Sequence, residues 1–161
     1  MRHTISVLVE NEFGVLSRVS GLFSGRGFNI ESLAVNRTLD PEVSCLTLVT
    51  GGPENIIEQI TKQLHKLIDV IKVTDMSEVE CVEREMVLIR VKAVDATRAE
   101  VLRVIDIFRG KVVDVSPKSY AIELTGNDEK IQAVIDILKP IGIQEIVRTG
   151  TIAMARAKKT A

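Results

Sequence analysis

The sequence predicts an α+β fold made of two ferredoxin-like βαββαβ units, and three observations support this prediction. Segments that alternate apolar and polar residues, as strands do, flank segments with the spacing of amphipathic helices. Their order is strand, helix, strand, strand, helix, strand, and it occurs twice, in residues 4–75 and 86–148. Short stretches also recur, since residues 22–27 resemble 107–111 and residues 48–54 resemble 123–129. Such a unit forms an antiparallel sheet with both helices on one face.

The chain divides into four parts on this interpretation. Residues 1–76 form the first unit, 77–84 an acidic and polar linker, 85–150 the second unit, and 151–161 a loose basic tail. The hairpin between the second and third strands is long in the first unit and short in the second. Each unit is small, so its core is marginal alone and oligomerisation through an open sheet edge is expected.

The predicted elements follow from the apolar positions. Ile5, Val7 and Val9 face inward along the first strand. Each of the four helices has an apolar stripe, and these are, in chain order, Val15, Leu16, Val19, Leu22 and Phe23; Ile56, Ile57, Ile60, Leu64 and Leu67; Val101, Leu102, Ile105 and Phe108; and Ile131, Val134, Ile135 and Leu138.

The composition excludes several classes of protein. The net charge is -1 and aromatic residues are 3%, so neither a basic field nor stacking rings favour nucleic acid. The longest apolar runs are too short to span a bilayer. The first residues enter a strand directly, and the two cysteines suit neither a metal loop nor a disulfide framework. We therefore expect a cytoplasmic protein.

No catalytic set is recognisable. His3 precedes a strand and His65 lies on the outer face of a helix, so both are expected at the surface. The serines lie in no nucleophile elbow, and the carboxylates form no paired motif. We expect no catalysis by this chain alone and no metal site.

The turn after the first strand is the strongest candidate site. It holds Asn11 and Gly14, and a helix begins at once with Val15 and Leu16. The first amides of a helix lack internal partners and suit a small anion, such as the carboxylate of a free amino acid. Gly14 is equally a plain turn glycine, and Asn11 a turn cap. However, aligning the helices of the two units places alanines at these positions, so the fold alone does not demand Asn11 and Gly14.

Four segments carry a family resemblance. They are ENEFGVLSRV (10–19), LFSGRGFNIESL (22–33), KQLHKLIDV (62–70) and VEREM (82–86). The first unit resembles an ACT domain, and the whole chain is similar to the regulatory (small) subunits of acetolactate synthase.

This resemblance implies a partner and an effector. The partner is a large catalytic subunit that carries thiamine diphosphate, FAD and Mg, and condenses two pyruvates, or pyruvate with 2-ketobutyrate, in branched-chain amino-acid biosynthesis. The small subunit carries none of these cofactors; it activates the transferase and confers feedback inhibition by valine, or in some members by leucine or isoleucine.

The resemblance also implies a site at the seam of a homodimer. Two ACT units pair side by side, with Asn11, Gly14, Val15 and Leu16 from one chain and Asn29 and Ile30 from the other around the effector. Phe13 is a variable position in this loop. A stand-alone amino-acid sensor is the alternative function. An RNA-binding module is disfavoured, because the third strand presents no aromatic side chains and the chain has one tyrosine. A metal carrier of this fold is disfavoured because it needs a paired-cysteine loop.

Overall fold

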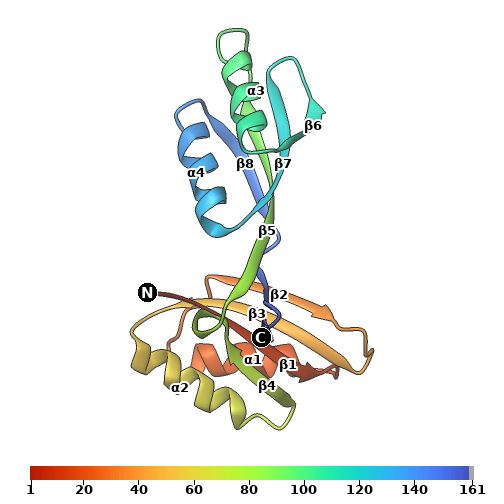
Figure 1. The fold of residues 1–161 in the computed structure, drawn as a ribbon, viewed down its shortest axis with the longest axis vertical. Coiled ribbons are helices and arrows are strands. Elements are labelled where there is room, and N and C mark those ends of the chain that lie inside the picture. The colour runs from red at the N-terminus through yellow and green to blue at the C-terminus, as the bar shows by residue number, and fades with distance from the viewer. Residues whose placement is uncertain (160–161) are drawn as a thin grey trace. The chain divides into compact units, whose positions relative to one another are not determined.

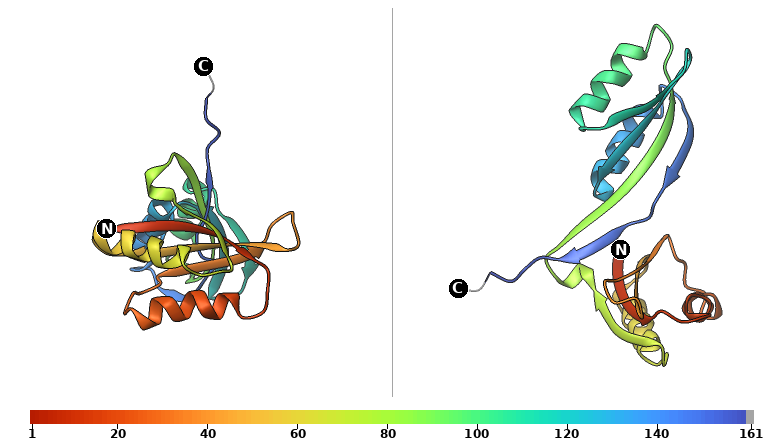
Figure 2. Two further views of the ribbon diagram at one scale, coloured as in Figure 1. Left: turned by 90° about the horizontal axis from the view of Figure 1, so that it is seen from below. Right: turned by 90° about the vertical axis from the view of Figure 1, so that its right-hand side faces the viewer.

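The computed structural model describes residues 1–159 and contains two compact units (Figures 1 and 2). One unit comprises residues 1–82 together with the chain from Thr151 onward, and the other comprises residues 83–150. The first unit contains β1 (Arg2–Glu10), α1 (Val15–Gly25), β2 (Ser32–Arg37), β3 (Val43–Gly51), α2 (Glu54–His65) and β4 (Val70–Asp75). β5 (Cys81–Lys92) begins in the first unit and continues into the second, which also contains α3 (Arg98–Ile107), β6 (Lys111–Val115), β7 (Ser119–Gly126), α4 (Asp128–Leu138) and β8 (Ile143–Arg148).

Both sheets have the same antiparallel topology. The strand order is β2-β3-β1-β4 in the first unit and β6-β7-β5-β8 in the second. In each unit both helices cover one face of the sheet (Figure 2). The prediction of two ferredoxin-like βαββαβ units is therefore confirmed.

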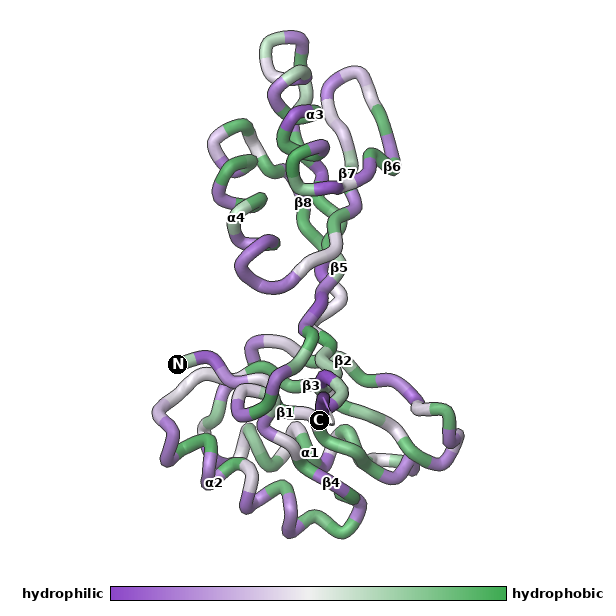
Figure 3. The backbone as a smooth tube through the Cα atoms, in the orientation of Figure 1, coloured by the Kyte–Doolittle hydropathy of each residue, from purple (hydrophilic) through white to green (hydrophobic). Residues whose placement is uncertain are grey.

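The core of each unit lies between the sheet and its helices. In the N-terminal unit, Ile5, Val7 and Val9 of β1 are fully buried against Phe23 of α1 and Ile60 of α2. Along α2 hydrophobic and hydrophilic residues alternate turn by turn, as the amphipathic pattern predicts (Figure 3).

Two predicted stripe positions are wrong in detail. Leu16 and Leu102 are 43% and 40% exposed, whereas Val104, which the prediction left out, is buried. Both leucines lie at the border of a stripe, where a difference of one helical position decides burial.

The C-terminal unit contains one strong internal ion pair. The carboxylate of Glu85, which is buried at the start of the paired part of β5, accepts hydrogen bonds from Nε and Nη2 of Arg148 at 2.6 and 3.0 Å. The hydrogen bond with Glu85 raises the pKa of Arg148 above its usual value. This pair joins the central strand β5 to the edge strand β8.

The segments that the sequence marks as linker and tail have regular structure. A short 3₁₀ helix η1 (Met76–Glu78) precedes β5, and β9 (Ile152–Ala155) pairs with β5. The amide of Thr151, a buried residue, donates to Oγ of Ser32 at 3.0 Å. The expectation of a loose tail is thus wrong for residues 152–155, because backbone pairing orders them; residues 160–161 lie outside the described residues.

His3 is also placed differently from its prediction. It lies within β1, is 7% exposed, and its Nδ1 is 3.1 Å from Oδ2 of Asp75. Because β1 begins at Arg2, one residue before His3, the side chain lies against the protein rather than in solvent.

Candidate functional site

The turn between β1 and α1 has the backbone geometry that its glycine suggests. Gly14 immediately precedes α1 and has φ 79° and ψ 0°, in the left-handed region. A Cβ at this position would lie 3.1 Å from Nη1 of Arg18, so a side chain would meet both strain and crowding.

The first turn of α1 has free hydrogen-bond donors. No side chain caps this helix among the described residues, and its first turn contains no acidic residue. The first helical bond runs from the amide of Arg18 to the carbonyl of Gly14 at 3.0 Å. Within residues 1–159, the amides of Val15, Leu16 and Ser17 make no hydrogen bond to another protein group. A helix start of this kind presents donors and a partial positive charge to an anion.

Arg18 adds a full positive charge at this turn. Its Nε donates to Oδ2 of the buried Asp69 at 2.7 Å, and its Nη2 lies 3.4 Å from the carbonyl oxygen of Phe13. The sequence interpretation missed both charged residues. Arg18 lies four residues after Gly14, and this spacing places it on the same helix face as the turn. No signal in the sequence pointed to Asp69.

Asn11 connects the turn to the neighbouring hairpin. Its Nδ2 donates to the carbonyl of Pro41 at 2.9 Å, and its amide donates to the carbonyl of Glu42 at 2.7 Å. The carboxamide oxygen makes no hydrogen bond within the described part of the chain, and the residue is exposed. An acceptor is therefore available beside the helix start.

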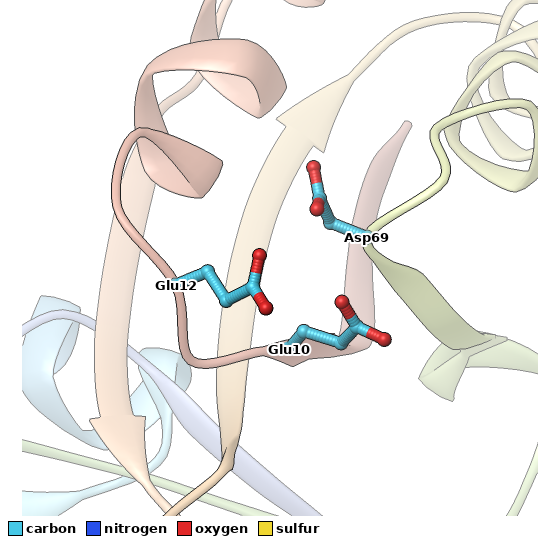
Figure 4. A group of neighbouring side chains, drawn as sticks. All are labelled: Glu10, Glu12 and Asp69. Carbon is cyan, nitrogen blue, oxygen red and sulfur yellow. The ribbon is translucent and has the colours of Figure 1, made fainter.

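A group of carboxylates lies beside the same turn. Oxygen atoms of Glu10, Glu12 and Asp69 lie within 4.8 Å of one another (Figure 4). Glu10 and Glu12 are exposed, and Asp69 is bonded to Arg18. The turn thus offers amide donors and a guanidinium next to carboxylates, an arrangement of opposite charges that suits a zwitterion.

Asn29 and Ile30 lie at the other end of the same sheet. Glu31, which follows them, donates its amide to the carbonyl of Val49, whereas Glu10 pairs with Val43. Six residues of β3 separate these levels, about 20 Å at the rise of a strand. A single chain therefore brings Asn11, Gly14, Val15 and Leu16 together but not Asn29 and Ile30.

The edge strand β2 spans the distance between the levels of these two groups: it begins two residues after Ile30, and its last residue, Arg37, pairs with Ser44, which also pairs with Val9 near the end of β1. β2 is an edge strand, so its outer backbone groups have no neighbouring strand within residues 1–159. Asn29 is exposed, and its carbonyl accepts a hydrogen bond from Oγ1 of Thr50 at 2.7 Å. Val15 is buried in the core, while Leu16 is partly exposed beside the turn.

The described residues contain no helix with the length and apolarity needed to cross a membrane.

Comparison with known proteins agrees with this architecture. Residues 5–72 match the family described as "AHAS small subunit-like ACT domain", and residues 84–157 match "Small subunit of acetolactate synthase". The acetolactate synthase small subunit of Haemophilus influenzae is 54% identical over 160 residues, covering 99% of this chain and 98% of the relative. The probable small subunit of Archaeoglobus fulgidus is 50% identical and covers 99% of each chain.

A solved structure supports the same assignment. The crystal structure of the acetolactate synthase small subunit from Thermotoga maritima matches with a TM-score of 0.86 and 42% identity, over 98% of this chain and 99% of that one. With two matching family descriptions, full-length relatives and a matching structure, this chain belongs to the acetolactate synthase small-subunit family.

Proposed function

We propose that this chain is the regulatory subunit that activates a thiamine-diphosphate-dependent acetolactate synthase and makes it sensitive to valine. Membership in the small-subunit family implies a catalytic large subunit as partner. In this proposal the cofactors of the reaction, thiamine diphosphate, FAD and Mg, belong to that large subunit. The regulatory chain contributes an amino-acid site and the contacts that transmit its occupancy.

The uncapped start of α1 is the observation that carries the proposal. The carboxylate of valine lies against the amides of Val15 and Leu16, which no protein group occupies in the described residues. Arg18 strengthens this position, because its guanidinium lies within 3.4 Å of the carbonyl preceding Gly14 and attracts the same anion.

The ammonium group needs acceptors on the opposite side. The carboxamide oxygen of Asn11 supplies one, because its nitrogen is already bonded to Pro41. The side chain of Asn29 and a carbonyl near Ile30 supply others. The exposed carboxylates of Glu10 and Glu12 favour the cation at longer range.

Completing this site requires a second copy of the chain. Antiparallel pairing of two β2 edges places the start of one β2 beside the end of the other. Asn29 of the partner subunit then lies next to the turn that holds Asn11 and Gly14. The two ends of the sheet lie about 20 Å apart within one chain, but in this two-fold arrangement one end of each chain meets the other end of its partner.

The energy of binding is divided between charge and apolar contact. Burying the isopropyl group against Leu16 and the partner's Ile30 contributes roughly 1.5–3 kcal/mol. Micromolar affinity needs about 8 kcal/mol, so the amides, Arg18 and the carboxamides supply the larger share. Discrimination among valine, leucine and isoleucine rests on a methylene, for which only about 1–3 kcal/mol is available.

Reconstitution tests the proposal. The purified large subunit is assayed for acetolactate formation alone, with this chain, and with this chain plus valine, leucine or isoleucine. We expect activation by the chain and inhibition by at least one of the three amino acids, with alanine as the control ligand. Calorimetric titration of the chain should give two effectors per β2–β2 seam, one for each chain, because the two-fold arrangement forms the site twice. A chain that sediments as a monomer, or that leaves the large subunit unaffected, would contradict the proposal.

A further inference from the structure

Three connections meet at one end of the N-terminal sheet. They are the β1–α1 turn (10–14), the β2–β3 hairpin (38–42) and the α2–β4 connection with the first two residues of β4 (66–71), which we call together the loop end. Backbone hydrogen bonds join them, from Glu10 to Asp69 at 2.9 Å and from Asn11 to Glu42 at 2.7 Å. The loop end is therefore one surface rather than three independent loops.

Each of these connections exposes one large apolar side chain. Leu39 is 106% exposed, Phe13 101% and Ile68 93%, and they are the three most exposed large hydrophobic residues of the described chain. Ile71, at the border of the same surface, is 53% exposed. These side chains do not stabilise the fold by burial, since none of them belongs to the core cluster of the unit or packs against it. Apolar side chains gathered at one end of a unit mark a protein–protein contact.

Acidic residues surround the apolar side chains. The loop end holds five carboxylates, of Glu10, Glu12, Asp40, Glu42 and Asp69, against the single cation of Lys66. When Arg18 of α1, which bonds to Asp69, is included, the formal net charge of the loop end is 2 − 5 = −3, whereas the net charge of the whole chain is -1. A groove of about 450 Å³ lies between Glu10, Glu12, Asp40, Glu42 and Ile71. A complementary partner surface is basic at its rim and apolar at its centre.

We propose that the loop end is the docking surface for the catalytic large subunit, and this inference rests on the proposed function. A second loop end is a poorer occupant, because it would bring like charges together, whereas the β2 pairing proposed above brings only the start of the partner's β2 to this end of the sheet. The surface also extends across the sheet, from the hairpin beside edge strand β2 to the connection before the opposite edge strand β4. Pairing through β2 therefore leaves Ile68 free for another partner.

This position gives the effector a short route to the catalytic subunit. Phe13, one of the three exposed apolar residues, immediately precedes Gly14. The free amides of Val15 and Leu16, which follow Gly14 and which we call the amide seat, are the proposed position of the effector carboxylate. Glu12 and Glu10 lie in the same turn. Ligand binding at the helix start thus acts on residues that contact the large subunit directly, so that one turn links both sites.

Substitutions away from the amide seat test this proposal. Ile68→Asp and Leu39→Asp replace fully exposed side chains, so the fold should tolerate them. Ile107→Asp is the matched control, because Ile107 is 66% exposed on α3 of the other unit. Association of each full-length variant with the purified large subunit is measured by calorimetry, and activation by titration of enzyme activity. We expect at least roughly tenfold weaker association for Ile68→Asp and Leu39→Asp, and wild-type behaviour for Ile107→Asp.

Two further readouts separate the possible outcomes. Sedimentation and valine titration of Ile68→Asp alone should match the wild type, since Ile68 lies neither at the start of α1 nor beside the β2 edge. Wild-type association of both loop-end variants would overturn the docking surface while leaving the proposed function intact. Loss of association in Ile107→Asp instead would assign docking to the C-terminal unit, and loss of the dimer in Ile68→Asp would assign the loop end to the homodimer. Failure of the wild-type chain to bind the large subunit would overturn both proposals.

Discussion

Replacing Gly14 by aspartate is the sharpest perturbation of the proposed amino-acid site. Gly14→Asp places a carboxylate at the start of α1, where the proposed effector carboxylate lies. Two unit charges 4 Å apart near a protein surface repel by about 4 kcal/mol. Nη1 of Arg18 lies 3.1 Å from the position of the new Cβ, so its charge offsets part of this repulsion. A net cost of about 2 kcal/mol still weakens valine binding roughly 30-fold, at 1.4 kcal/mol per factor of ten.

A matched variant isolates the effect of the charge. Gly14→Asn has nearly the same shape, makes the same Cβ contact and tolerates the left-handed conformation about as well as aspartate, but it is neutral. The difference between the two variants therefore measures electrostatic repulsion alone. We expect the aspartate variant to need roughly 30-fold or more additional valine for half-inhibition, and the asparagine variant less than tenfold by the same scale.

The assay is acetolactate formation by the reconstituted enzyme over a range of valine concentrations. Both variants should still activate the large subunit, because the exposed apolar residues of the loop end are unchanged. Equal losses in the two variants would show that crowding, not charge, weakens binding. Full valine inhibition in Gly14→Asp would refute the assignment of the amide seat.

Three further changes test other parts of the structure. Arg18→Gln should weaken valine binding roughly tenfold and lower the melting temperature of the N-terminal unit, because Asp69 stays buried without its cation; calorimetry and a thermal scan measure these effects. Arg148→Ala should lower the free energy of unfolding of the C-terminal unit by about 2 kcal/mol, less than for a fully buried pair because Arg148 is partly solvated. Urea unfolding of Arg148→Ala, Glu85→Ala and the double variant should show that the two losses of stability do not add. Deleting residues 151–161 should lower the stability of the N-terminal unit by about 1–3 kcal/mol, since Thr151 and β9 pack there; an unchanged melting curve would contradict that packing.

The sequence predicts the fold well because local patterns and the repeat agree. Alternating residues such as Ile5 and Val7 specify β1, and the stripes that include Ile60 and Ile131 specify helices with their buried faces. The tail was harder to predict, because β9 is held by backbone pairing with a distant strand. Its sequence contains the exposed Ile152 and Met154 and then basic residues, which resemble an unstructured end when considered locally.

The structure also changes which residue of the second unit corresponds to Gly14. Sequence alignment of the helices placed Ala99 opposite Gly14, whereas the structure places Thr97 immediately before α3, where Gly14 precedes α1. Thr97 has φ −119°, so the equivalent turn in the second unit needs no left-handed residue. The fold can therefore make this connection without glycine, and Gly14 serves a turn that the second unit lacks.

The residues of the proposed amino-acid site were predictable only in part, because some are neighbours in sequence and others meet only through packing or a second chain. The turn from Asn11 to Leu16 is contiguous, and its uncapped helix start follows from the residues themselves. Arg18 and Asp69 meet through the packing of α1 against the α2–β4 connection, which no short stretch of sequence encodes. Asn29 lies at the far end of the same sheet, so its role depends on a second chain. A site divided between two protomers, as proposed here, would bind its ligand only when the β2 edges meet, and effector binding and dimerisation would then strengthen each other by the same free energy.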